Sequence, residues 1–164
     1  MYIHLLLKCI LLKIKCKYKL MDSQRKKYSE LTDCLCTNIR KSARNISQKY
    51  NEHLKQSGEK INANQVSILV TLSQIENKTI SELSNQLKME RTTLTRNLKI
   101  LDKSGWIKTD YGSDGRMKFS KLSKNGKQVL DKILPHWKKA QSQTKKLLGE
   151  DLQLFQQNLK KLTL

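Results

Sequence analysis

The chain has 164 residues, which is enough for one compact domain with an apolar core. Its 33 Lys and Arg against 14 Asp and Glu give a formal net charge of +19, which favours a polyanionic partner, although a solvated lysine-rich surface is an alternative explanation. Four cysteines without a CxxC pair exclude a dense disulfide scaffold and indicate free thiols in a reducing cytoplasm: Cys9, Cys16, Cys34 and Cys36.

Residues 1–20 differ in composition from the rest of the chain. Lysines interrupt their apolar runs, and no small-residue cleavage site follows, so the segment does not fit a signal peptide. It is also too short and too charged to cross a bilayer. We expect it to be a dispensable extension before Met21, with a basic amphipathic arm at a membrane surface as the alternative.

A helical pattern runs from Asp22 to Leu54, where apolar side chains recur at mostly four-residue steps. The sequence Gln56–Gly58 should end this helix. Asn62 or Asn64 can cap a second helix. That helix carries the apolar residues Val66, Leu69, Val70 and Leu72.

Two shorter helices are predicted next. Thr79 and Glu82 have the spacing of a capping box for a helix over Ile80–Leu87. Lys88–Glu90 should form a tight turn, and a fourth helix should run from about Arg91 to Ser104. A helix–turn–helix unit is therefore expected here.

A β-hairpin is predicted after this unit. Gly105 stands where a left-handed residue should end the fourth helix, with Trp106 as its apolar contact. Residues 106–111 and 116–122 have strand character, and Gly-Ser-Asp-Gly at 112–115 supplies the turn between them. Alternation places three residues on one side of the return strand: Met117, Phe119 and Lys121.

The C-terminal part is helical in pattern. Ser123 can cap a long helix, which Pro135 should kink or divide in two. The last segment has a heptad-like apolar stripe, formed by Leu148, Leu152, Phe155, Leu159 and Leu162.

The fourth helix has a polar face without acidic residues. At 100° per residue, Leu94, Leu98 and Leu101 share the inward face. The outward face of this helix carries hydroxyls and cations, and such side chains suit base edges and phosphates in a major groove. Near the hairpin tip, Arg116 and Lys118 could reach a narrow minor groove. The outward face of the helix carries Thr92, Arg96, Lys99 and Lys103.

The stretch Ile80–Lys127 resembles the DNA-binding lobe of the MarR family of winged helix-turn-helix regulators. The likeness lies in the run Arg91–Leu98, the Asp-x-Arg pattern at Asp114–Arg116, and Leu122–Gly126. It extends over about residues 30–162 through two further segments, Cys34–Lys41 and Leu134–Gln141.

Two positions depart from the family pattern. Glu90 stands where the family usually has Asp, and Glu is a poorer N-cap because its side chain is longer. Gly115 stands where a second wing arginine is common, which would lower affinity for the minor groove. Arg116 keeps the position on which the motif depends most.

The resemblance implies a mainly α-helical fold with a small β-hairpin wing, joined to a helical dimerisation region from both chain ends. The expected parts are an extension (1–20), an N-terminal dimerisation helix (21–60), the winged helix-turn-helix lobe (61–123) and C-terminal dimerisation helices (124–164). Two lobes of a homodimer would read a pseudo-palindromic operator. The expected DNA contacts are Arg91, Thr92, Thr93, Thr95, Arg96, Lys99, Asp114, Arg116 and Lys118.

The dimerisation residues are expected in the C-terminal stripe, since a small lobe could not bury both end helices alone. Packing of these helices on their own lobe is the alternative. The residues in question are Leu148, Leu152, Phe155 and Leu159.

Other candidate sites are weaker. The three histidines, His4, His53 and His136, lack the spacing of metal ligands, and structural or surface roles are expected. Cys34 and Cys36 lie about 200° apart on a helix and cannot chelate one metal. Some MarR relatives sense oxidants through a cysteine here, but a small buried apolar role is favoured. No catalytic constellation, metal site or cofactor motif is readable, so an enzyme is not expected.

The sequence therefore predicts a cytoplasmic, sequence-specific double-stranded DNA-binding transcriptional regulator. A repressor released by a small ligand or by oxidation is the preferred form, with activation left open. A non-specific nucleic-acid-binding or chromosome-coating protein is the alternative, although it would not need the hydroxyl-rich start of the fourth helix. A membrane-surface protein using residues 1–20 is a third possibility.

Overall fold

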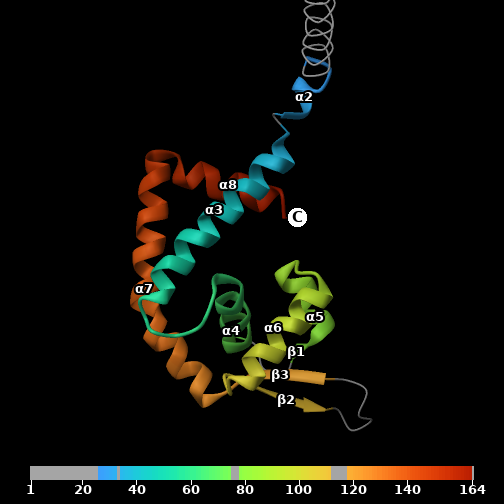
Figure 1. The fold of residues 1–164 in the computed structure, drawn as a ribbon, viewed down its shortest axis with the longest axis vertical. Coiled ribbons are helices and arrows are strands. Elements are labelled where there is room, and N and C mark those ends of the chain that lie inside the picture. Colours follow the sequence, from blue (N-terminus) through green and yellow to red (C-terminus); the bar gives the residue numbers. More distant parts are fainter. Residues whose placement is uncertain (1–25, 33, 75–77, 112–117, 164) are drawn as a thin grey trace, which may run out of the picture. The chain divides into compact units, whose positions relative to one another are not determined.

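The computed structural model describes residues 26–32, 34–74, 78–111 and 118–163. The chain divides into two compact units, residues 1–44 and 45–164. As the sequence predicts, the described part is mainly α-helical with one small antiparallel sheet. Its elements (Figure 1) are α2 (Ser29–Thr32), α3 (Leu35–Lys55), α4 (Ala63–Gln74), β1 (Lys78–Thr79), α5 (Ile80–Leu87), α6 (Arg91–Lys103), β2 (Ile107–Tyr111), β3 (Lys118–Leu122), α7 (Lys124–Leu148), the 3₁₀ turn η1 (Gly149–Asp151) and α8 (Leu152–Lys161).

The expectation of one continuous helix from Asp22 to Leu54 is wrong. The short α2 ends at Thr32, and α3 begins at Leu35. The Thr32 hydroxyl donates to the Ser29 carbonyl at 2.5 Å, and side-chain bonds of this kind compete with the helical backbone pattern. The predicted end is confirmed, because α3 stops at Lys55 and Gly58 follows with φ 79°.

Asn62, rather than Asn64, caps α4. Its Oδ1 accepts from the Gln65 N–H, and the Gln65 Oε1 accepts from the Asn62 N–H, both at 3.0 Å. This reciprocal arrangement satisfies two backbone donors at the helix start. Gln65 is buried as a result, a role that the apolar pattern of the helix did not indicate.

The helix–turn–helix boundaries are confirmed. Thr79 and Glu82 form the capping box of α5, and the hydrogen bonds from Thr79, above all from its backbone N–H, lower the pKa of the Glu82 carboxyl. Lys88 ends α5 in the left-handed region. The Ser84 hydroxyl then donates to the Met89 carbonyl at 2.7 Å, which closes the turn before α6.

The end of α6 is a Schellman motif around Gly105, whose φ is 71°. The Trp106 N–H donates to the Leu101 carbonyl at 3.0 Å, and the Gly105 N–H donates to the Asp102 carbonyl at 2.8 Å. The chain is thereby turned back, so that β2 runs beneath α6 (Figure 1).

The sheet has three strands in the order β1-β3-β2. The hairpin strands are confirmed, but β1, which pairs with β3 through Lys78 and Thr79, was not expected. The buried residue of β3 is Ser120, at 2% exposed, and not one of the residues on the predicted apolar side. Phe119 and Lys121 of that side are half-buried, and Met117 lies outside the described residues.

Of the two outcomes predicted for Pro135, division of the C-terminal helix is wrong, since α7 continues from Lys124 to Leu148, and a kink stays a prediction. Proline removes one backbone donor, and the carbonyl that loses its partner belongs to Asp131, an exposed residue at which water can replace the bond. The Ser123 cap is confirmed, because its hydroxyl accepts from the Gly126 N–H at 2.9 Å.

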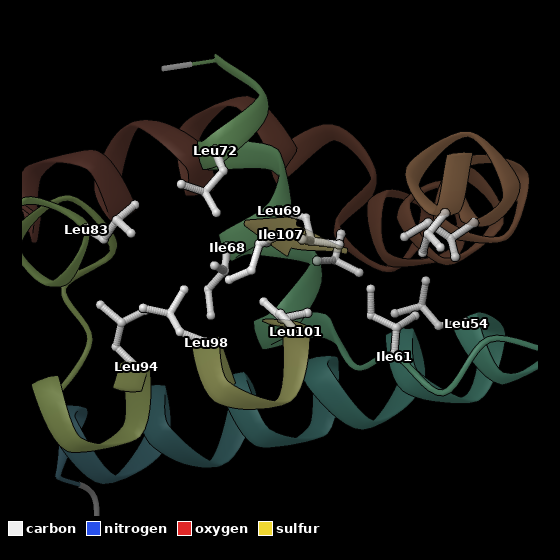
Figure 2. Close-up of a cluster of buried hydrophobic side chains, with 13 residues drawn as sticks. Leu54, Ile61, Ile68, Leu69, Leu72, Leu83, Leu94, Leu98, Leu101 and Ile107 are labelled. Carbon is white, nitrogen blue, oxygen red and sulfur yellow. The ribbon is translucent and has the colours of Figure 1, made fainter. Parts of the chain in front are cut away.

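The core of the second unit gathers around α4. Figure 2 shows Ile68, Leu69 and Leu72 of α4 between Leu83 on one side and the pair Leu54 and Ile61 on the other. From α6 and β2, the cluster receives Leu94, Leu98, Leu101 and Ile107, all at most 6% exposed. Since α6 is fixed by three buried leucines, its opposite face is held outward.

Candidate nucleic-acid interface

The outward face of α6 is as the sequence predicts. Leu94 and Leu101 are fully buried and Leu98 is 6% exposed, whereas the polar residues opposite them are exposed: Thr92, Arg96, Lys99 and Lys103. Arg91, at the start of the helix, is also exposed. The acidic residue of the helix, Asp102, accepts a hydrogen bond from the Thr109 hydroxyl of β2 at 3.4 Å. The exposed face therefore presents cations and a hydroxyl.

Three polar residues of α6 are tied to the helix itself. The Thr95 hydroxyl donates to the Arg91 carbonyl at 2.8 Å, which leaves its oxygen lone pairs to accept from a ligand. Thr93 is half-buried, and its carbonyl accepts from the Asn97 amide at 2.9 Å. Asn97 is 8% exposed, so it lies on the buried side of α6 and stabilises the helix through this hydrogen bond. The sequence did not indicate this role.

Glu90 precedes α6 without a side-chain capping bond. This agrees with the expectation that glutamate closes the cap less well than aspartate. The first backbone N–H groups of α6 thus have no cap from Glu90, and the Glu90 side chain is exposed next to Arg91.

The two lysines of β3 have different surroundings. Lys121 Nζ lies 2.5 Å from an Asp110 carboxylate oxygen. Lys118 Nζ lies 5.1 Å from the centroid of the Tyr111 ring. The two other wing residues singled out from the sequence, Asp114 and Arg116, lie outside the described residues, as do Gly115 and the 112–115 turn.

The predicted dimerisation residues lie on α7 and α8. Phe155 is 39% exposed and Leu159 38% exposed, and Leu148 and Leu152 are half-buried. Three further apolar side chains on this stretch are more exposed: Leu147, Leu154 and Leu162. The single chain thus leaves much of the C-terminal stripe in contact with water.

Cys34 and Cys36 are not the buried apolar residues that were favoured from the sequence, because Cys34 is half-buried and Cys36 is exposed. Cys34 precedes α3, and its carbonyl accepts from the Asn38 N–H at 3.0 Å. Hydrogen bonds from the Thr37 backbone and side chain lower the pKa of the Cys34 thiol.

Two histidines of the second unit have partly buried rings. His53 Nε2 lies 2.9 Å from Gln143 Oε1, whereas the buried Nδ1 atoms of His53 and His136 make no hydrogen bond. Among the described residues, no three His, Cys, Asp or Glu side chains come close enough together to hold a metal ion. His4 lies outside the described residues.

An apolar groove lies between α3, α4 and α7. It contains adjoining cavities of about 350 Å³ and 260 Å³ that share Val66, Val70 and Trp137. The Trp137 ring packs edge-on against Tyr50 at 6.3 Å between centroids. Burial raises the pKa of the Tyr50 phenol, whose hydroxyl donates to Gln141.

Comparison with known proteins decides the family. A model of the MarR family matches residues 61–110. The crystal structure of the transcriptional regulator MosR of M. tuberculosis in complex with DNA has a TM-score of 0.71 and 31% sequence identity, covering 80% of this chain and 94% of that one. The chain belongs to the MarR family.

Two further relatives agree with this assignment. This chain is 35% identical over 95 residues to YwoH of Bacillus subtilis, described as an uncharacterized HTH-type transcriptional regulator, covering 58% of this chain and 68% of that protein. A mutant MarR of E. coli complexed with operator DNA shares the fold, with a TM-score of 0.71 and 22% identity over 84% of this chain and 97% of that one. None of the described helices is long and apolar enough to cross a membrane.

Proposed function

We propose that this MarR-family chain is a sequence-specific double-stranded DNA-binding transcriptional regulator that works in the cytoplasm as a homodimer. The observation that carries this proposal is the exposed face of α6, where Thr92, Arg96 and Lys99 project opposite three buried leucines. Hydroxyls and cations on a rigid helix can contact base edges and phosphates together. The relative MosR, whose structure is in complex with DNA, supports the same conclusion.

The wing would supply a second contact. Arg116 would enter the minor groove beside each half-site, and Asp114 would orient its guanidinium by a charge-assisted hydrogen bond. Closure of the turn by Asp114 alone is the alternative. These two roles follow from the Asp-x-Arg pattern in the sequence.

The homodimer would bring two α6 helices to the two halves of a pseudo-palindrome. The apolar side chains exposed on α7 and α8 support this arrangement, because a partner that covered them would remove them from water. Release of DNA could follow from an apolar ligand in the groove around Trp137, or from oxidation of Cys34 or Cys36.

The deciding experiment is selection of bound sequences from a random duplex pool, at one stated salt concentration. We expect an enriched inverted repeat whose half-sites lie about one helical turn apart. Affinity for this site should exceed affinity for a shuffled duplex by at least about 10³-fold. Equal binding to every duplex would instead favour the non-specific nucleic-acid-binding protein, and no binding to any duplex would refute both functions.

A small-ligand effector is tested separately. A ligand seated in the groove should change the fluorescence of Trp137 and weaken operator binding over the same concentration range. Trp137→Phe should remove the optical signal while leaving operator binding intact in the absence of ligand. Oxidative release should disappear in a variant in which Cys34 and Cys36 are both serine.

A further inference from the structure

Tyr111 and Lys118 are paired across the last described rung of the hairpin. They lie directly opposite each other, Tyr111 at the end of β2 and Lys118 at the start of β3. Lys118 Nζ lies 5.1 Å from the centroid of the Tyr111 ring, within the range of a cation–π interaction. Both side chains are exposed, Tyr111 at 61%.

The pair projects from the side of the hairpin that faces the lobe. Side chains alternate along a strand, so Tyr111 shares a face with the buried Ile107, and Lys118 shares a face with the buried Ser120. The Thr109 hydroxyl, on the same face of β2 as Tyr111, donates to the Asp102 carboxylate of α6 at 3.4 Å, so this face of the hairpin is turned toward α6. Lys118 therefore lies on the same side of the hairpin as α6.

Lys118 and Lys121, the two lysines of β3, are not electrostatically equivalent. The charge of Lys121 is compensated by the Asp110 carboxylate at 2.5 Å on the opposite face of the sheet. None of the ion pairs among the described residues involves Lys118. An aromatic face attracts an ammonium group without neutralising its charge, and it leaves N–H donors for another acceptor.

We infer that Tyr111 is a positioning residue, which holds the Lys118 ammonium ready for a phosphate of the DNA backbone beside α6. This inference rests on the proposed DNA-binding function. A free lysine has a flexible four-carbon stem, whose ordering on binding lowers affinity. The Tyr111 ring orders that stem before DNA arrives, and the compact ammonium then contacts one phosphate as a point charge.

The test is a double-mutant cycle on the selected duplex, with affinity measured over a range of KCl concentrations. Lys118→Ala should lower the magnitude of the salt slope by about one per protomer. Tyr111→Leu should weaken binding about two- to fivefold in the wild-type background. It should have no further effect in the Lys118→Ala background, and Tyr111→Phe should bind as the wild type does because it keeps the ring.

The chain offers a matched control in a second cation–π pair, in which Lys27 Nζ lies 5.7 Å from the Tyr28 ring centroid. Tyr28→Leu should leave the salt slope unchanged, because Tyr28 lies in the expected dimerisation segment and not in the DNA-facing lobe. Equal weakening by Tyr111→Leu in both backgrounds would mean that Tyr111 only supports the hairpin, and would overturn the inference. Unchanged binding by Tyr111→Leu would overturn it as well, whereas a wild type that binds no duplex would refute the proposed function itself.

Discussion

The Oδ1 atom of Asn51 in α3 accepts a hydrogen bond from the backbone N–H of Ala63, the first residue of α4, at 2.7 Å. The N–H groups at a helix start have no partner within the helix, so this bond satisfies one of them. Asn51→Ala should lower the free energy of unfolding by about 1–2 kcal/mol, measured by urea denaturation. Asn64→Ala, at an exposed position of the same helix, is the control and should change it by less than about 0.5 kcal/mol. Equal effects of the two substitutions would contradict a specific role for the Asn51 bond.

Arg96 is expected to read a base edge. Arg96→Ala should cost roughly 1–3 kcal/mol on the selected site and relax the preference at one or two base pairs. Lys103→Ala, on the same face at the far end of α6, should weaken all duplexes evenly. The measurement is repeated selection with each variant. If Arg96→Ala weakens every duplex to the same extent, Arg96 contacts phosphate only.

Leu152 is expected to lie at a subunit interface. Leu152→Asp would place a charge in an apolar contact and should shift the sedimentation coefficient from dimer to monomer. Gln153→Asp introduces the same charge at the neighbouring exposed position and should leave the dimer intact. A dimer that survives Leu152→Asp would place the interface elsewhere and favour packing of α8 on its own chain.

Cys34 is expected to react at lower pH than an ordinary thiol, because hydrogen bonds from Thr37 favour its thiolate. The alkylation rate of a variant in which Cys9, Cys16 and Cys36 are serine should therefore reach half its maximum below the pH found for a cysteine peptide. Thr37→Val removes the hydroxyl donor and should move that midpoint upward. A midpoint equal to that of the peptide in the unsubstituted Thr37 background would contradict the prediction.

The lowered pKa of the Cys34 thiol also makes the free energy of unfolding depend on pH. The folded chain favours the thiolate, so this contribution to folding is fully present above the ordinary thiol pKa. It is lost as the pH falls through the lower pKa of the folded chain. Thr37→Val should reduce this dependence of stability on pH.

Local signals in the sequence predicted the helix ends of the lobe well. The Thr79 cap, the Gly105 terminus and the Ser123 cap each depend on residues within five positions of one another, so the sequence alone contains the whole interaction. The outward face of α6 was predictable for the same reason, because the period of a helix places Arg96 opposite buried leucines.

Features that depend on distant pairing were missed. β1 has only two residues and exists because Thr79 pairs with Phe119, about forty positions away along the chain. The burial of Ser120 depends on the same pairing, and its small polar side chain gave no apolar signal. Tyr111 was not singled out either, since its relation to Lys118 requires the register of the hairpin.

Gly126 marks the place where α7 leaves the lobe. A Cβ atom at this position would lie 2.1 Å from the Trp106 carbonyl oxygen, so only glycine permits the approach. The Ser123 hydroxyl also donates to the Gly105 carbonyl at 2.7 Å, and the Ser123 N–H donates to the Trp106 carbonyl at 3.0 Å. The Gly105 and Trp106 carbonyl groups belong to the backbone, so they cannot move away from α7 by a change of side-chain rotamer. We therefore expect a tilt of the first turn of α7 to displace Gly105 and Trp106, and with them the C-terminal end of α6 and its DNA-facing residues.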